Sequence, residues 1–375
     1  MKTPGNPFIT LGYAGPEFFC DRKEETESIL RSIVNNTPVT LTSIRRIGKT
    51  GLLQHVLSKL PRNYVGIYLD IQSAETLNDF MNILATSMIH SVPEKSKPGK
   101  VIWRFIKSLR PVITFDQLTG SPQVSIDSKA GKAEPDIETS LNFLDKQPFR
   151  VVIAIDEFQQ ILNFPEKRTD AWLRSKIQLM NNLTFIFSGS QQHLMSELFN
   201  SPSRPFYRST GFMRINKIND DDYRKFITRL FLNGNRKITG EVVDQILEWA
   251  EHITYYIQLL CNRVYSSGEK EITSSLWQSE AGLLIKETEP VFYSYRELLT
   301  HPQWMLLKAL AAEKKVISPT SGEFMNKYHL SGSATVLQSL KALVTKDLVY
   351  KDYDAGGQAF HSVNDLLFKR WVCNQ

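Results

Sequence analysis

The stretch Ser43-Ile44-Arg45-Arg46-Ile47-Gly48-Lys49-Thr50 decides the fold class of this chain. The short strand-like run 39–43 leads into it, and a helix-like segment that ends before Pro61 follows it. We expect a buried strand, a tight turn and a helix, because proline interrupts a helix interior. The stretch fits a phosphate-binding loop at every position but the first, where Ser43 replaces glycine. It therefore predicts a nucleotide site, and an ordinary helix N-terminus is the alternative.

Each residue type in this loop has a chemical reason. Lys49 would reach the β- and γ-phosphates, and the Thr50 hydroxyl would ligate Mg²⁺. Gly48 would let the backbone, with its N–H groups, approach the phosphate oxygens closely. The candidate nucleotide-binding residues of the loop are Ser43, Ile44, Arg45, Arg46, Ile47, Gly48, Lys49, Thr50 and Gly51.

A second motif ends the apolar run 151–155, which reads as a buried strand and is followed by Asp156 and Glu157. Two carboxylates at such a strand end are costly unless they meet a cation or water. Asp156 would hold Mg²⁺, and Glu157 would orient and deprotonate the attacking water. Two solvated surface acids are the alternative. Both motifs together, in this order, predict ATP and Mg²⁺ as cofactors.

Further polar residues follow the next apolar run, 183–187, which ends in Ser188-Gly189-Ser190. We expect Ser190 beside the γ-phosphate, with Ser188 as the alternative, and Ser190 could also cap the following helix. Farther along, Arg204 and Arg208 flank an aromatic pair. Either one could act as an arginine finger, in cis or from a neighbouring subunit. A surface arginine stacked on tyrosine is the alternative.

Composition bounds the class of protein. The chain has 375 residues, 42% hydrophobic and 22% charged, which excludes wholesale disorder. Three widely spaced cysteines argue against a disulfide scaffold or a structural zinc site and favour a reducing cytoplasm. The N-terminus does not resemble a signal peptide, and no apolar run approaches 18 residues, so no membrane span is expected. The net charge of +6 permits an anionic partner.

The order of patterns along the chain predicts three domains. Strand-like and helix-like stretches alternate over residues 10–215, which indicates an α/β fold with a mostly parallel sheet. Asp21 and Glu24 have capping-box spacing and would open a helix. Residues 92–146 read as an irregular insertion with a hairpin around 118–122. We expect an ATPase core at 1–218, a helical lid at 219–294 and a small C-terminal domain at 295–375.

Four segments together resemble the archaeal-type ATPase family, which belongs to the AAA+/STAND division of P-loop NTPases and is similar to the origin-recognition ATPases. They are Phe19-Cys20-Asp21-Arg22-Lys23-Glu24-Glu25, Arg45-Arg46-Ile47-Gly48-Lys49-Thr50, Ile155-Asp156-Glu157-Phe158-Gln159 and Ser188-Gly189-Ser190. The resemblance spans nearly the whole chain, including a C-terminal winged helix. It implies a five-stranded parallel core, a helical lid and ATP-dependent switching. It also implies that Phe19 and Arg22 lie near the adenine.

Three features depart from the family pattern. Ser43 replaces the first loop glycine, so the opening turn of the loop can differ. Where relatives often carry Gly-x-Pro in the lid, this chain has His252-Ile253-Thr254-Tyr255-Tyr256. A clear sensor-two arginine is absent from the pattern, and Arg263 is the nearest candidate.

The C-terminal domain carries an apolar stripe that predicts one buried helix face: Val336, Leu337, Leu340, Leu343 and Val344. The opposite face would present Thr335, Gln338, Ser339, Lys341 and Thr345. A helix–turn–helix shape admits DNA contact, but few cations are available for it, namely Lys341, Lys346 and Lys351. We therefore expect a protein partner for this domain, with DNA as the rival.

The sequence thus predicts a cytoplasmic, ATP-binding switch with slow Mg²⁺-dependent ATP hydrolysis and a winged-helix output. One alternative is an origin-recognition-like DNA-binding protein in which nucleotide is mainly structural. Another is a degenerate loop that serves as an interaction scaffold. An oligomer is possible, and the sequence leaves the partner open.

Overall fold

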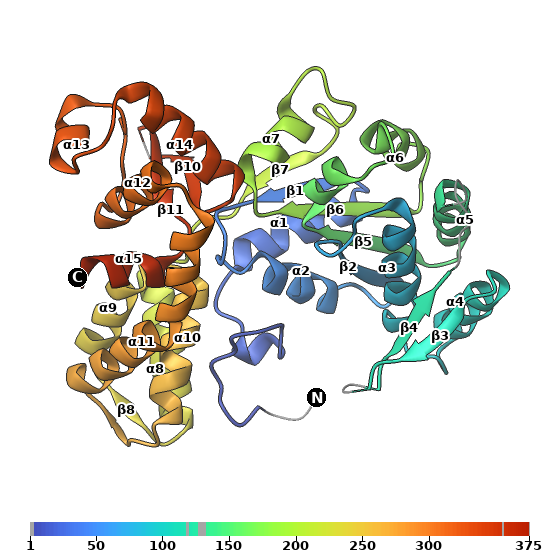
Figure 1. Ribbon diagram of the computed structural model, residues 1–375. Coiled ribbons are helices and arrows are strands. Elements are labelled where there is room, and N and C mark those ends of the chain that lie inside the picture. Colours follow the sequence, from blue (N-terminus) through green and yellow to red (C-terminus); the bar gives the residue numbers. More distant parts are fainter. Residues whose placement is uncertain (1–3, 118–119, 127–132, 355, 375) are drawn as a thin grey trace. The chain divides into compact units, whose positions relative to one another are not determined.

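The computed structural model describes residues 4–117, 120–126, 133–354 and 356–374 (Figure 1). The chain divides into two compact units, Gly12–Asn216 and a second unit formed by Met1–Leu11 with Lys217–Gln375. The three domain boundaries proposed above stay a prediction. Leu118 and Thr119 of the predicted hairpin and Ala355 of the predicted wing lie outside the described residues.

A five-stranded parallel sheet forms the centre of the first unit, which confirms the α/β prediction (Figure 1). In spatial order its strands are β2 (Tyr64–Asp70), β5 (Arg150–Asp156), β6 (Leu183–Gly189), β1 (Val39–Thr42) and β7 (Gly211–Arg214). All residues of β1 and β6 are buried, as expected for strands covered on both faces. Because the strands are parallel, their carboxyl ends share one edge of the sheet.

Helices surround this sheet. They are α1 (Lys23–Val34), α2 (Lys49–Ser58), α3 (Leu77–His90), α6 (Thr169–Ile177) and α7 (Gln192–Asn200), with short 3₁₀ helices η1 (Pro16–Phe18) and η2 (Phe158–Asn163). The capping box predicted at Asp21 is wrong. Arg22 is the N-cap of α1 in a left-handed conformation (φ 64°), and no side chain caps this end. The reason is that the Arg22 side chain is directed at the phosphate-loop backbone.

The insertion at 92–146 is more regular than the sequence suggested. It contains α4 (Lys97–Ser108), the hairpin β3 (Val112–Phe115) and β4 (Pro122–Ser125), and α5 (Ala133–Asp145). The two strands pair antiparallel, which confirms the predicted hairpin. Ile102 and Ile106 of α4 are fully buried in the same apolar core as the sheet. The insertion is therefore packed onto the first unit.

The second unit begins with the helices predicted as a lid. They are α8 (Asp220–Asn233), α9 (Gly240–Trp249), α10 (Thr254–Ser266) and α11 (Ser274–Leu298), with a small pair of strands, β8 (Lys237–Ile238) and β9 (Glu271–Ile272). Tyr256, Leu260 and Val264 of α10 are fully buried and recur at helical spacing, so they form one apolar face of this helix. His252 lies 2.9 Å from Asp220.

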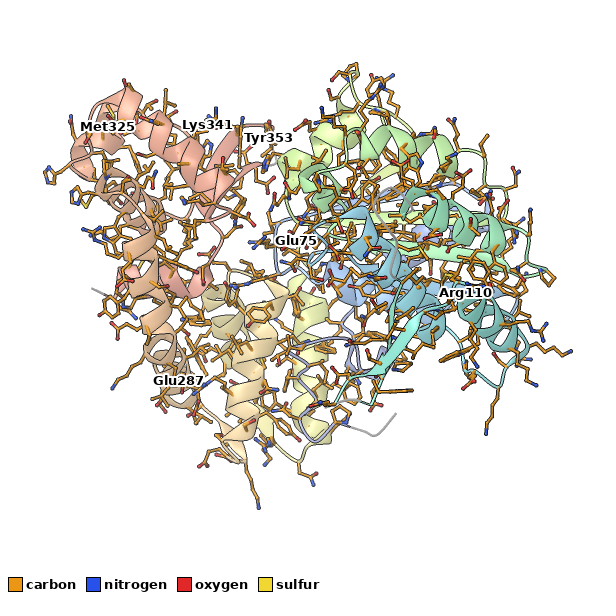
Figure 2. The ribbon with its side chains drawn as sticks, turned by 45° about the vertical axis from the view of Figure 1, so that its right-hand side comes forward. Glu75, Arg110, Glu287, Met325, Lys341 and Tyr353 are labelled. Carbon is orange, nitrogen blue, oxygen red and sulfur yellow. The ribbon has the colours of Figure 1, made fainter. Side chains whose placement is uncertain are left out.

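The winged helix follows as α12 (His301–Ala312), α13 (Gly322–Lys327), α14 (Ser333–Thr345), β10 (Val349–Tyr353), β11 (Ala359–Val363) and α15 (Leu366–Cys373). Figure 2 labels Lys341 on α14 and Tyr353 at the end of β10. Val316 adds one bridge to His361 of the β10–β11 hairpin. No helix in the described part of the chain is long and apolar enough to span a bilayer.

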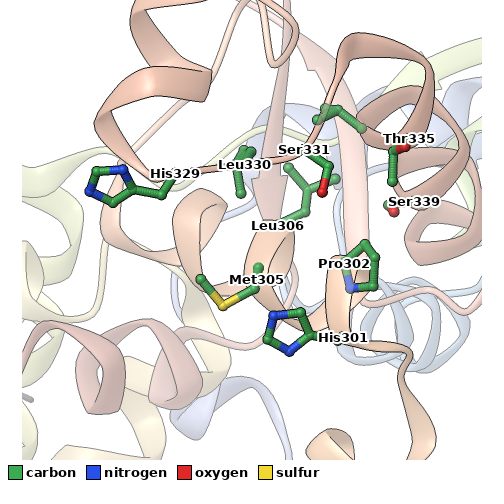
Figure 3. Close-up of a pocket in the computed structure, with 10 residues that line it drawn as sticks. His301, Pro302, Met305, Leu306, His329, Leu330, Ser331, Thr335 and Ser339 are labelled. Atoms are coloured by element: carbon green, nitrogen blue, oxygen red, sulfur yellow. The ribbon is translucent and has the colours of Figure 1, made fainter.

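Two predictions about α14 are wrong. Leu337, predicted to be buried, has 57% of its surface exposed, whereas Ser339, predicted to be exposed, has only 5%. Helix α14 packs on α12 through Val336, Ser339, Leu340 and Leu343, so a serine occupies one position of the apolar face. A cavity of about 60 Å³ lies between these helices, and its lining includes Met305 and Leu306 of α12 and Ser339 of α14 (Figure 3).

Candidate nucleotide-binding site

The phosphate loop joins β1 to α2 through two residues in left-handed conformation, Arg46 (φ 67°) and Gly48 (φ 98°). Glycine takes this conformation without steric cost. Gly48 is the N-cap of α2, and neither a side-chain cap nor an acidic residue in the first turn neutralises this helix end. The N-terminal N–H groups of a helix attract anions. The loop geometry therefore suits a phosphate group.

Lys49 lies inside this loop with only 6% of its surface exposed. Its Nζ donates to Ser43 Oγ at 2.9 Å and lies 3.4 Å from the Ile44 carbonyl oxygen. Ser43, which replaces the expected glycine, is fully buried and donates its own hydroxyl proton to the same carbonyl at 2.7 Å. The serine hydroxyl thus helps hold the lysine within the loop.

The end of β5 contacts the start of α2 directly. Thr50 Oγ1 donates to Asp156 Oδ2 at 2.6 Å, and Asp156 is 2% exposed. Tyr68 of the neighbouring strand β2 donates to the same oxygen at 3.1 Å. Burial and the Asp156 charge raise the pKa of Tyr68 well above its usual value, so it stays a donor at neutral pH. A hydroxyl and a carboxylate are hard oxygen donors of the kind that Mg²⁺ prefers.

Glu157 follows in a left-handed conformation (φ 53°) that turns the chain from β5 into η2. Its Oε2 accepts hydrogen bonds from Ser190 Oγ at 2.9 Å and from Gln159 Nε2. The Ser190 backbone N–H donates to it as well. A Cβ at Gly189 would clash with the side chains of Gln159 and Met195, so a larger residue at this position would displace them. The structure brings Glu157 and Ser190 together, as the sequence order of the motifs suggested.

Asp70 is an additional carboxylate that the sequence reasoning missed. It ends β2 directly opposite Asp156 in the parallel register. Burial raises its pKa, and the nearby charges of Asp156 and Glu157 raise it further, against a hydrogen bond from the Gln72 N–H. Three carboxylates thus share this edge of the sheet. The sequence signal that could have identified Asp70 is an acidic residue at the end of the strand-like stretch 64–69, as Asp156 follows the apolar run 151–155.

Phe19, one of the two residues expected near the adenine, contacts α2. The ring of Phe19 stacks on His55 of α2 with centroids 4.4 Å apart, and Tyr13 donates to or accepts from His55 Nδ1 at 2.8 Å. A Cβ at Gly51 would lie 3.5 Å from the Phe19 ring, which is ordinary contact. Burial lowers the pKa of His55, and Lys59 adds to this effect. His55 and Tyr13 were not singled out from the sequence.

Arg22 contacts the backbone of the phosphate loop. It is 3% exposed, its guanidinium lies 3.4 Å from the Ile47 carbonyl oxygen, and it pairs with Glu25 at 2.7 Å. These contacts place Arg22 against the backbone of the phosphate loop. Its predicted position near the adenine stays a prediction.

The two arginine-finger candidates have different surroundings. Arg204 pairs with Glu197 and with Asp170 at 3.3 Å, and the Glu197 hydrogen bond raises its pKa. Arg208 is exposed, takes a left-handed conformation (φ 49°) and lies 5.2 Å from the centre of the Tyr207 ring. Arg263, the sensor-two candidate, pairs with Glu280 and Glu287 of α11.

The buried Ser188 hydroxyl is a polar atom with no hydrogen-bond partner among the described residues. Ser188 is fully buried in β6 and pairs with Leu41 of β1, two residues before the phosphate loop. A polar group buried without a partner at this edge fits a site that a polar ligand completes. Together with the Thr50–Asp156 pair, it indicates that these residues suit a nucleotide with Mg²⁺.

The comparisons with known proteins agree with this geometry. The sequence pattern of the family described as an ATPase domain predominantly from Archaea matches residues 19–260. The chain belongs to this family. A probable winged-helix domain matches residues 290–374. Family membership makes the chain an ATPase-domain protein that binds nucleotide, with a C-terminal winged helix. No curated protein matches the sequence.

Solved structures resemble the fold of this ATPase. The Walker-type ATPase of Pyrococcus abyssi has a TM-score of 0.68 at 17% identity, covering 98% of this chain and 99% of that one. The ORC2 protein of Aeropyrum pernix, in ADPNP–ADP complexes, has a TM-score of 0.62 at 12% identity, covering 98% and 95%. The ORC1 protein of the same organism, in complex with DNA, has a TM-score of 0.52 at 12% identity, covering 99% and 97%. They share the AAA+-like fold.

Proposed function

We propose that this protein is a Mg²⁺-dependent ATP switch that hydrolyses ATP slowly and passes its nucleotide state to the winged helix. The contact between Thr50 and Asp156 carries the proposal. It joins the first turn of α2 to the end of β5, and it places two oxygen atoms that can ligate Mg²⁺ 2.6 Å apart. The ATPase family of the chain supports the same reading. Its ORC relatives, one of them solved with ADPNP and ADP, share the fold.

Each residue of the site has a role in this proposal. Lys49 exchanges its contacts with Ser43 and Ile44 for the β- and γ-phosphates, and Thr50 and Asp156 hold Mg²⁺. When bound, Mg²⁺ neutralises charge on the phosphate oxygens. Glu157 orients the attacking water and takes its proton.

Ser190 lies where it can couple the γ-phosphate to Glu157. Its hydroxyl donates to Glu157 Oε2, which also accepts from the Ser190 backbone N–H and from Gln159 Nε2, so three donors occupy this carboxylate oxygen. We propose that Ser190 turns its hydroxyl to the γ-phosphate and thereby frees Glu157. A hydrolysis rate that depends on this rearrangement would be slow, as expected for a switch.

The test is ATP affinity after Lys49→Ala, measured by calorimetric titration of the full chain with Mg²⁺ present. Loss of a charged hydrogen-bond donor costs roughly 1.5–3 kcal/mol, so affinity should fall about 10- to 150-fold. Lys59→Ala, an exposed lysine at the other end of α2, is the matched control and should bind ATP like the wild type. Equal ATP affinity in the wild type and Lys49→Ala would refute the site.

A further inference from the structure

Residues 95–115 form a segment with a large local excess of positive charge. It contains six basic residues and no acidic one: Lys95, Lys97, Lys100, Arg104, Lys107 and Arg110. The chain has 45 basic and 39 acidic residues, so outside this segment 39 basic residues balance 39 acidic ones. The charge of +6 on this segment thus equals the net charge of the whole chain.

Helix α4 arranges these cations on one side. Lys97, Lys100, Arg104 and Lys107 follow the spacing i, i+3, i+7, i+10, which places them along one exposed stripe. The opposite side buries Ile102 and Ile106 in the core. Figure 1 shows α4 at the periphery of its unit beside the β3–β4 hairpin, and Figure 2 labels Arg110 in the connection between them.

Nothing in the described part of the chain neutralises this stripe. No ion pair joins a basic residue of this segment to an acid among the described residues, and Lys107 Nζ lies 5.5 Å from the centre of the Trp103 ring. Glu138 of the neighbouring α5 pairs instead with Lys176. The first turn of α4 holds Lys97 and Lys100 and no acid, which opposes the helix dipole and raises the local positive potential. Helix stability does not explain this arrangement.

We propose that the cationic stripe of α4 binds the phosphate backbone of duplex nucleic acid, independently of the winged helix. The stripe spans ten residues, or about 15 Å at 1.5 Å per residue. One strand of a duplex carries a phosphate every 3.4 Å of axis, so about four phosphates fall within this length. The contact is to the backbone and carries no base specificity. A bilayer fits less well, since the apolar side of α4 is buried in the protein.

The experiment measures binding of the full-length protein to a labelled duplex DNA by fluorescence anisotropy at several salt concentrations. The wild type should bind at about 50 mM salt with a log–log slope of about −4 to −5, from four to six phosphate contacts. The triple variant Lys100→Glu, Arg104→Glu, Lys107→Glu should bind at least tenfold more weakly, with a slope closer to zero by about 2.7. Unchanged circular dichroism and ATP turnover would show that the variant is folded.

The matched control reverses three exposed lysines of the winged helix, Lys341→Glu, Lys346→Glu and Lys351→Glu, and changes the net charge equally. It should retain most of the duplex binding. The proposal is overturned if this control loses binding while the α4 variant retains it, or if the wild type does not bind duplex at low salt. It is also overturned if vesicles of phosphatidylserine and phosphatidylcholine bind the stripe and duplex DNA does not. If the reversed variant fails to fold, Lys100→Gln, Arg104→Gln, Lys107→Gln tests the same contacts.

Discussion

Asp156 accepts hydrogen bonds from three groups of the candidate site. One of its carboxylate oxygens accepts from Thr50 and Tyr68, and the other accepts from the backbone N–H of Glu157 at 3.1 Å. These donors fix the carboxylate in a buried position beside the loop. Groups that orient a metal ligand are commonly worth 10–100-fold in metal affinity or activity. We therefore expect Tyr68 to act as a positioning residue for Asp156.

Tyr68→Phe tests this role. Removing the hydroxyl should raise the Mg²⁺ concentration for half-maximal ATP turnover by roughly 10-fold or more, because Asp156 loses one of the donors that orient it. A titration of turnover with Mg²⁺ at saturating ATP measures the effect. Tyr64→Phe, at the opposite end of β2, is the control and should leave the Mg²⁺ requirement unchanged. The same requirement in both variants would show that Tyr68 does not position the ligand.

The sequence predicted the loop residues because their pattern is local. Lys49 and Thr50 follow a strand within one continuous motif, and Asp156 and Glu157 end another. Tyr68 and Asp70 reach the site only through the pairing of β2 with β5, whose register no local pattern contains. The start of α1 was misjudged for a similar reason, since Arg22 contacts Ile47 across 25 positions of sequence.

Among the elements, α14 shows where periodicity is insufficient. The apolar residues of this helix admit more than one face, and only its packing on α12 selects the face that contains Val336, Leu340 and Leu343. Ser339 completes that face beside a small cavity (Figure 3). Leu337 is left exposed. The helix itself was predictable from the sequence, whereas the exact set of residues on its buried face was not.

Two leucine truncations test this assignment of the α14 face. Leu343→Ala removes a fully buried side chain and should destabilise the winged helix by about 2–5 kcal/mol. Leu337→Ala removes an exposed side chain and should change stability by about 0.5 kcal/mol or less. Calorimetric melting of the two full-length variants measures the difference. Equal melting temperatures would contradict the packing of α14.

At the scale of the whole molecule, the two arginine candidates bear on whether one subunit supplies a residue to the ATP site of its neighbour. Arg204 already pairs with two carboxylates, whereas Arg208 is exposed on the surface. If Arg208 completes a neighbouring site, Arg208→Ala should bind ATP normally and lose turnover, by about 10³-fold or more for a full arginine finger. Wild-type turnover per subunit should then rise with protein concentration. A concentration-independent rate from a strict monomer would exclude a finger acting between subunits.

ATP turnover by the pure full-length protein, with and without Mg²⁺, tests the central claim most directly when wild type and Glu157→Gln are compared. Glutamine keeps the size of the side chain but cannot take a proton. The account predicts Mg²⁺-dependent turnover in the wild type, a fall of about 10²–10⁴-fold in Glu157→Gln, and ATP binding in both. Equal turnover in the two proteins, or turnover that needs no Mg²⁺, would contradict it.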